Sequence, residues 1–135
     1  MSEGAVVLDA SAVLALVWAE PGANVVMGEL PGALITSVNF AEVLTKLSDK
    51  GWQVDAAAEA ILSLGVIPVD FSNDHAMLAA QMRHVTKSAG LSLGDRACLS
   101  LGQQLRAKVL TADLAWLKVR DALGIDVVAI RQPRS

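Results

Sequence analysis

The chain has 135 residues, a usual size for one domain with a single substantial core. Hydrophobic residues make up 53% of it, which leaves apolar surface for a subunit interface, and the net charge of -3 excludes a protein held on nucleic acid by overall electrostatic attraction. The longest apolar run, 12–19, is far shorter than the roughly 20 residues that span a bilayer, and a single cysteine, Cys98, excludes an internal disulfide. We therefore expect one cytoplasmic domain over 1–135 that does not enter a membrane, with a loose tail at 132–135.

Short apolar runs rich in valine, isoleucine and leucine alternate with longer stretches of helical periodicity. The predicted strands lie at 5–8, 34–36, 66–69, 109–111 and 126–130. The predicted helices lie at 12–19, 23–30, 38–50, 54–64, 73–89, 93–107 and 115–123. Strands that alternate with helices need crossover connections, and crossovers on both faces make a mostly parallel sheet. The pattern predicts an α/β domain of three layers, α/β/α, around a five-stranded sheet.

Acidic residues follow three of the predicted strands, at the edge where parallel sheets bind their ligands. Asp9 follows the first strand, Asp70 the third and Asp113 the fourth. Each can instead cap the next helix, because a short acidic side chain accepts hydrogen bonds from free backbone N–H groups there. Ser11 competes with Asp9 for that role, which leaves the Asp9 carboxylate available for other chemistry.

Two further acids lie in predicted helices. Asp95 follows Ser92 by three residues, the spacing of a capping box, so capping accounts for it as well as a ligand-binding role does. Glu42 lies nearly opposite Phe40 and Val43 by helical periodicity, which by itself assigns the side chain to solvent. Spacing alone therefore does not decide whether Asp95 and Glu42 have a structural or a functional role.

Four blocks of sequence carry a resemblance to a known family. They are VLDASA at 7–12, VNFAEVL at 38–44, LSLGDRACL at 91–99 and VLTADLAW at 109–116, and their order and separations resemble those of PIN domains, specifically VapC-type toxins of toxin-antitoxin systems. The resemblance implies a PIN domain over the whole chain and an acidic quartet of Asp9, Glu42, Asp95 and Asp113, supported by the hydroxyls of Ser11 and Thr111. Gly94 stands where the family more often has alanine, and no basic strip rich in aromatic residues is present to grip RNA.

An all-carboxylate cluster suits Mg²⁺ or Mn²⁺ better than zinc, because these hard ions prefer oxygen ligands. We expect one or two ions held mainly by Asp9 and Asp95, with Glu42 and Asp113 acting directly or through water, and hydrolysis of RNA by an activated water. The bound cation also reverses the sign of an acidic cleft where a phosphate must lie. The family resemblance implies an endoribonuclease that leaves a 5′-phosphate and a 3′-hydroxyl.

The same resemblance implies two protein partners, a second copy of the chain in a homodimer and an antitoxin that covers the cleft. For the RNA itself, Arg83, Lys87 and Arg96 flank the third acid in sequence and are the predicted phosphate contacts. A solvated helix face is the alternative interpretation of these three residues.

Two other functions stay open at this point. A receiver-type phospho-acceptor domain would use Asp9, Asp70 and Thr111, although the chain lacks the adjacent acidic pair of such domains and has Arg131 in place of their lysine. A PIN-like binding module with little activity of its own would share the fold and the partners. Metal-dependent cleavage of RNA separates the nuclease from both.

Overall fold

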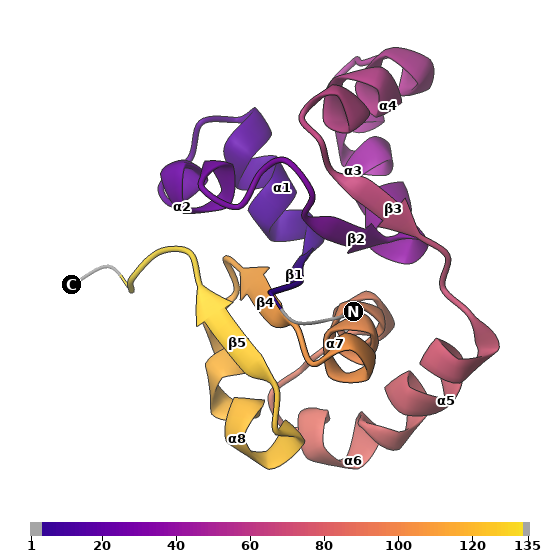
Figure 1. Ribbon diagram of the computed structural model, residues 1–135, viewed down its shortest axis with the longest axis vertical. Coiled ribbons are helices and arrows are strands. Elements are labelled where there is room, and N and C mark those ends of the chain that lie inside the picture. Colours follow the sequence, from indigo (N-terminus) through magenta and orange to yellow (C-terminus); the bar gives the residue numbers. More distant parts are fainter. Residues whose placement is uncertain (1–3, 134–135) are drawn as a thin grey trace.

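Five short strands form a fully parallel sheet in the computed structural model, which describes residues 4–133 (Figure 1). The strands are β1 (Val6–Leu8), β2 (Leu34–Thr36), β3 (Ile67–Val69), β4 (Lys108–Thr111) and β5 (Asp126–Ala129). Their order across the sheet is β3-β2-β1-β4-β5, and each neighbouring pair is parallel. Every predicted strand is confirmed to within one residue at each end. Part of the predicted loose tail, residues 134 and 135, lies outside the described residues.

Helices cover both faces of the sheet, which confirms the three-layer α/β/α architecture. They are α1 (Ala10–Val17), α2 (Ala23–Met27), α3 (Ser37–Asp49), α4 (Val54–Ser63), α5 (Asn73–Gln81), α6 (Arg83–Thr86), α7 (Leu93–Leu105), the 3-10 helix η1 (Leu114–Lys118) and α8 (Arg120–Leu123). In Figure 1, α1 to α4 gather on one side of the sheet and α5 to α8 on the other. Within residues 4–133, no helix is long and apolar enough to cross a membrane.

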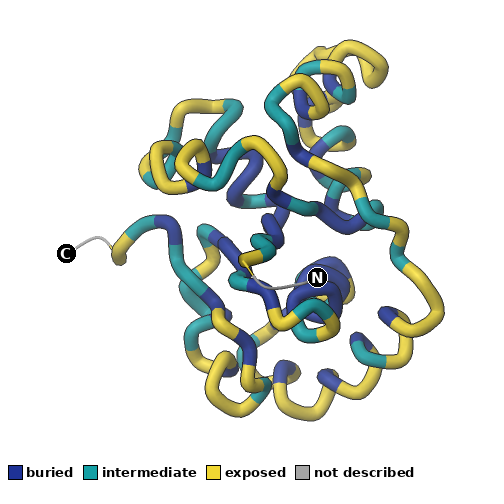
Figure 2. The backbone as a smooth tube through the Cα atoms, viewed as in Figure 1, coloured by how far each residue is buried: buried dark blue, intermediate teal, exposed yellow. Residues whose placement is uncertain are grey.

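The two faces of the sheet have separate hydrophobic cores, because side chains alternate along a strand. Leu8 and Leu110 pack with α1 to α4, whereas Val7 and Val109 pack with α7 and the segment that contains Trp116. Figure 2 shows the buried backbone concentrated on the central strands, α1 and α7, with the outer helices largely exposed. Strands buried on both faces explain why the sequence reads as continuous apolar runs rather than as alternation.

Two of the predicted helices are interrupted. The helix predicted at 73–89 is divided at Met82, whose ψ of -11° ends α5, and Thr86 Oγ1 donates to the Met82 carbonyl at 2.9 Å. The helix predicted at 115–123 is a 3-10 helix and a short α-helix that meet at Val119, where φ is -114°. Both interruptions arise from local backbone geometry that hydrophobic periodicity does not report.

The topology brings two strand ends together at the centre of the sheet. The chain proceeds outward from β1 to β2 and β3, then crosses back to place β4 on the other side of β1. Connections that leave β1 and β4 in opposite directions open a crevice beyond their carboxyl ends. Asp9 and Asp113 follow these two strands, so the fold places them at this crevice.

Candidate functional site

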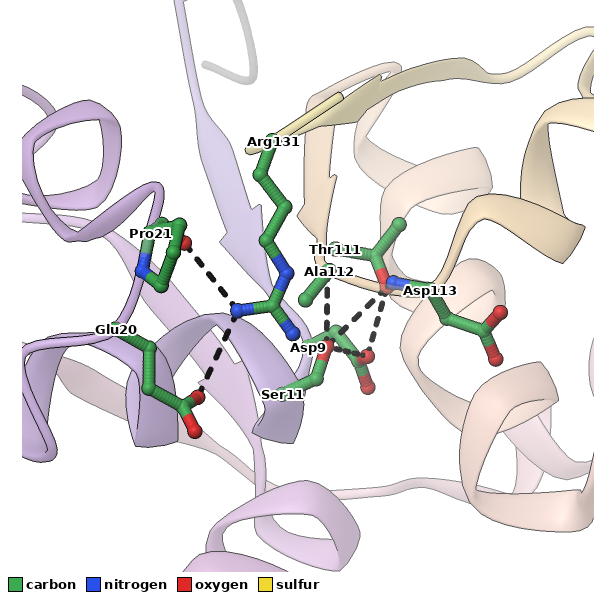
Figure 3. Close-up of polar contacts among 8 residues, drawn as sticks. All are labelled: Asp9, Ser11, Glu20, Pro21, Thr111, Ala112, Asp113 and Arg131. Atoms are coloured by element: carbon green, nitrogen blue, oxygen red, sulfur yellow. Dashed lines mark hydrogen bonds and ion pairs between the residues drawn. The ribbon is translucent and has the colours of Figure 1, made fainter. Parts of the chain in front are cut away.

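Asp9 lies directly after β1, and its side chain is buried, with 4% of the residue exposed. Its Oδ2 accepts hydrogen bonds from Ser11 Oγ at 2.6 Å and from Thr111 Oγ1 at 2.9 Å, as Figure 3 shows. Ser11 Oγ also accepts the backbone N–H of Ala112 at 2.9 Å. The capping interpretation is wrong for Asp9, because its side chain makes no cap hydrogen bond to α1. The two hydroxyls instead join the ends of β1 and β4 through the Asp9 carboxylate.

Burial raises the pKa of Asp9 to about 6. Hydrogen bonds from Ser11 and Thr111 lower that pKa, and the nearby charge of Asp95 raises it again. Removing a carboxylate from water disfavours its charged form, and donors aimed at it compensate only in part. A further positive charge beside Asp9 would therefore stabilise the ionised form of its carboxylate.

Asp113 is exposed, two residues after Thr111. Its backbone N–H donates to Thr111 Oγ1 at 3.0 Å, and its Oδ1 accepts the backbone N–H of Ala115 at 3.0 Å. The capping interpretation is thus confirmed for Asp113, which begins η1. A carboxylate has two oxygens, so capping through Oδ1 is compatible with a further role for Asp113.

Asp95 belongs to a capping box at the start of α7, as its spacing from Ser92 predicts. The Ser92 N–H donates to Asp95 Oδ2 at 2.9 Å, and the Asp95 N–H donates to Ser92 Oγ at 3.2 Å. Burial raises the pKa of Asp95, with a smaller rise from the charge of Asp113, while the bonds from Ser92 and the charge of Arg96 lower it. The cap thus fixes one carboxylate oxygen and orients the Asp95 side chain at the start of α7.

Glu42 is half-buried, although helical periodicity alone assigns it to solvent. Asn39 Nδ2 donates to Glu42 Oε1 at 2.8 Å and to the Gly94 carbonyl at 2.9 Å, which ties α3 to the start of α7. A Cβ at position 94 would lie 2.5 Å from Glu42 Oε2, so the glycine leaves the space that this carboxylate occupies. Glycine in place of alanine at position 94 therefore lets the Glu42 carboxylate lie against the start of α7.

Asn39 is a residue of the site that spacing arguments miss. It is completely buried, and its Oδ1 accepts the hydroxyl of Thr36 at 2.6 Å, while Thr36 Oγ1 accepts the Asn39 N–H at 3.0 Å. Asn39, Val43 and Leu47 recur every fourth residue and are all buried, so periodicity does place this amide on the inner face of α3. A buried amide needs polar partners, and that need is the signal that points from Asn39 to Glu42.

One open pocket of about 300 Å³ is lined by all four acids of the predicted quartet. The fold brings Asp9 and Asp113 to it from the strand ends, Glu42 from α3 and Asp95 from α7. The remaining lining residues are Ala10, Ser11, Leu14, Trp18, Glu20, Lys46 and Arg131. Residues from four separate parts of the chain thus meet in one place.

The predicted RNA contacts lie elsewhere. Arg83 is on α6, Lys87 directly follows it, and neither lines the pocket. Arg96 is partly buried, with Nη1 donating to the Ala79 carbonyl at 3.0 Å, and it does not line the pocket either. None of these three cations lines the pocket, although the charge of Arg96 acts on Asp95 from outside it.

The donor set of the pocket fits a hard divalent cation, because its acids offer only oxygen atoms. Among residues 4–133, no three His, Cys, Asp or Glu side chains are grouped closely enough to bind one ion in common. Magnesium usually keeps several waters and shares only one or two carboxylates, so an open arrangement of this kind suits it. The charge of Asp95 raises the pKa of Asp9, so these two carboxylates lie near enough to affect each other.

Cys98 is a buried residue near three of these acids. It is fully buried, and burial followed by the charges of Asp9, Asp95 and Glu42 raises the pKa of its thiol well above the ordinary value. The thiol therefore stays protonated and packs as a small apolar side chain.

The PIN-domain family model matches residues 6–122 of the chain. The fold is similar to a toxin-antitoxin complex from Klebsiella pneumoniae, with a TM-score of 0.74 and 18% identity over 96% of this chain and 100% of that chain. It is also similar to DNA-bound VapBC from Salmonella typhimurium, with a TM-score of 0.71 and 12% identity over 95% and 99% of the two chains. FitAcB from Neisseria gonorrhoeae has a TM-score of 0.65 and 19% identity over 93% and 97%. No curated protein matches the chain in sequence.

At these identities the similarity to solved structures shows the fold. The receiver alternative is wrong, because the family model that matches is a different one and β1 lies between β2 and β4 rather than between the second and third strands. Asp70 is exposed after the edge strand β3 and does not line the pocket with Asp9.

Proposed function

The chain belongs to the PIN-domain family, and from that premise we propose that it is a metal-dependent endoribonuclease that acts as the VapC-type toxin of a toxin-antitoxin pair. The observation that carries the proposal is the pocket in which Asp9, Glu42, Asp95 and Asp113 meet at the carboxyl edge of the sheet. Similarity to a solved toxin-antitoxin complex and to VapBC supports the biological role.

In this proposal each acid has a distinct task. Asp9 and Asp95 bind one or two Mg²⁺ or Mn²⁺ ions, and Glu42 and Asp113 position ions or waters. The hydroxyls of Ser11 and Thr111 hold the Asp9 carboxylate in one orientation. When bound, the ion supplies positive charge for the phosphate oxygens and lowers the pKa of the water that hydrolyses the phosphodiester bond.

Asn39 acts indirectly in the same mechanism. It donates to Glu42 Oε1 and is itself held by Thr36 at the end of β2 and by the Gly94 carbonyl. Because Asn39 is completely buried, its amide cannot exchange these hydrogen bonds for bonds to water. We assign it as a positioning residue that sets where the Glu42 carboxylate enters the pocket.

The proposal includes two protein partners and a single PIN domain over residues 1–135. Exposed apolar side chains on α2, Val25 and Met27, and on α4, Val54 and Leu62, form the surfaces that we assign to a homodimer or to an antitoxin. An antitoxin segment that covers the pocket would block RNA and metal together.

The first experiment incubates the purified chain, freed of any bound partner, with a mixed RNA pool in EDTA, Mg²⁺ or Mn²⁺. We expect cleavage only with a metal, and loss of cleavage in Asp95→Asn. Asp121→Asn is the matched control, since Asp121 is exposed on α8 and lies outside the pocket.

Cleavage that persists in EDTA, or that is equal in Asp95→Asn and the wild type, would contradict the proposal. If no condition gives cleavage but Mg²⁺ raises the melting temperature of the wild type and not of Asp95→Asn, the pocket binds metal and the chain is a binding module.

A further inference from the structure

Two basic side chains, Lys46 and Arg131, share the acidic pocket. No other lysine or arginine of the described chain lines it. They come from opposite sides, Lys46 from α3 and Arg131 from the residue that follows Ile130 at the end of β5. The pocket therefore has a negative floor and two separate positive points on its rim.

Lys46 lies one helical turn after Glu42, on the same face of α3. Its ammonium is not used by Glu42, whose Oε1 accepts from Asn39. Among residues 4–133, three ion pairs are present and Lys46 takes part in none of them. Lys46 is thus an exposed cation beside the acids with its charge available for a ligand.

Arg131 is held at the rim rather than extended into solvent. Its Nη1 donates to the Pro21 carbonyl at 3.3 Å and lies 3.7 Å from Glu20 Oε1, and Figure 3 shows the guanidinium between these partners and the Asp9–Ser11 pair. These contacts use one nitrogen of a planar group that carries five N–H donors. The half-exposed pair with Glu20 contributes little stability, so the remaining donors can bind phosphate oxygens in a forked arrangement.

Trp18 provides an aromatic surface in the same pocket. It follows the last residue of α1, lines the pocket beside Leu14, and is 39% exposed. Stacking of a base on an exposed aromatic side chain is worth about 1–3 kcal/mol and tolerates any base. An exposed aromatic side chain that shares a pocket with basic residues is a common combination for single-stranded nucleic acid, whose bases are free to stack.

We propose that Lys46 and Arg131 bind the phosphates that flank the cut in single-stranded RNA and that Trp18 stacks one of the adjacent bases. The inference rests on the proposed nuclease function and assigns its substrate contacts to residues other than Arg83, Lys87 and Arg96. The divalent ion serves the phosphate that is cut, whereas the neighbouring phosphates of the strand need cations of the protein, because the chain as a whole is negative.

The test measures binding of a fluorescent single-stranded RNA by anisotropy at several salt concentrations. All variants are made in the Asp95→Asn background, so that the RNA is not cut. Lys46→Gln and Arg131→Gln should each raise Kd about fivefold and reduce the slope of log Kd against log salt by about 0.7, the value of one phosphate contact on a single strand. Trp18→Ala should weaken binding about tenfold without changing the slope, and Trp18→Phe should restore most of it.

Lys50→Gln is the matched control, because Lys50 is an exposed lysine one turn further along the same segment and outside the pocket. In the active protein the lysine and arginine variants should raise KM more than they lower kcat, and circular dichroism should show an unchanged fold.

Failure of the inference can be distinguished from failure of the proposed function. If the wild type cuts RNA with metal but the Lys46 and Arg131 variants bind RNA with the same affinity and salt slope as Lys50→Gln, the assignment of the rim is wrong. If Arg83→Gln and Lys87→Gln produce the loss instead, the substrate lies on α6. If the wild type neither binds nor cuts RNA, the nuclease proposal itself is wrong.

Discussion

Replacing Asp9 by asparagine removes a buried charge while keeping the shape of the side chain. The amide oxygen of asparagine can still accept the hydroxyls of Ser11 and Thr111, which lie 2.6 and 2.9 Å from Asp9 Oδ2. The substitution therefore isolates the cost of the charge. Because burial raises the pKa of Asp9 from 3.8 to about 6, that cost follows from the difference between the folded and unfolded values.

The sign of the effect is the reverse of that for a salt-bridged carboxylate. The folded chain binds the Asp9 proton more tightly than the unfolded chain does, so the contribution of Asp9 to the free energy of unfolding is largest below pH 4 and falls as the pH rises through 6. A difference of about two pKa units corresponds to about 3 kcal/mol at 1.36 kcal/mol per unit. Asp9→Asn should thus be more stable than the wild type by up to about 3 kcal/mol at pH 7 without metal, and by little at pH 4.

The assay is urea unfolding of both proteins between pH 4 and pH 8, in EDTA and in Mg²⁺. Magnesium should stabilise the wild type and not the variant, so the two curves should approach each other at pH 7 when the ion is present. Asp121→Asn, an exposed acid on α8, should change neither curve. A variant that is less stable than the wild type at pH 7 in EDTA would refute the reasoning, because it would mean that hydrogen bonds to the ionised carboxylate outweigh its burial.

Three further substitutions test the groups that hold the acids. Asn39→Asp should lower the free energy of unfolding by about 3 kcal/mol at pH 7, because it replaces two hydrogen bonds by repulsion against Glu42. Urea unfolding should show that this stability recovers in acid, and equal losses at pH 5 and pH 8 would count against the explanation. Thr111→Val removes a donor that lowers the pKa of Asp9, so the pH profile of cleavage should move to higher pH, and an unmoved profile would contradict that role. Gly94→Ala should alter the free energy of unfolding by less than about 1 kcal/mol, because alanine favours the helix while the Glu42 carboxylate must leave Asn39. Its affinity for Mg²⁺, measured by calorimetry, should fall, and an unchanged affinity would show that Glu42 does not act on the ion.

The sequence allowed the layers and strands to be predicted because every strand is a short run rich in valine, isoleucine and leucine, the central strands β1 and β4 are almost entirely buried, and glycine or proline separates each strand from the next. The roles of individual acids were harder to predict, since they depend on contacts between distant residues. Spacing cannot reveal that Thr111 donates to Asp9, 102 positions away, or that Asn39 turns Glu42 towards α7. Asp95 and Asp113 do act as caps, so the structural interpretation of these residues was correct as far as it went.

The basic residues show a second reason why the positions of individual side chains were harder to predict than the strands. Arg83, Lys87 and Arg96 were chosen for their closeness to Asp95 in the chain, yet none of them lines the pocket, and only Arg96 is near enough for its charge to act on Asp95. The rule that located Asp9 and Asp113, residues just beyond the carboxyl end of a strand, also locates Arg131 after β5. Applying the strand-end rule to cations as well as to acids would have placed Arg131 at the pocket from sequence alone.

Charge in the pocket makes binding of metal and of RNA interdependent. The lining has five acidic and two basic side chains, so without a cation it carries three more negative than positive charges and repels a phosphate. A divalent ion removes most of that excess, and the factor by which it tightens RNA binding must equal the factor by which RNA tightens its own binding. Anisotropy titrations of RNA in EDTA and in Ca²⁺ measure the first factor, and calorimetric titrations of Ca²⁺ with and without RNA measure the second. Both are made on the wild type and on Asp113→Asn. Removal of the Asp113 charge should reduce the coupling, because fewer negative charges then remain for the ion to offset; a coupling that stays the same would mean that the ion bridges to the phosphate directly and that net charge in the pocket is secondary.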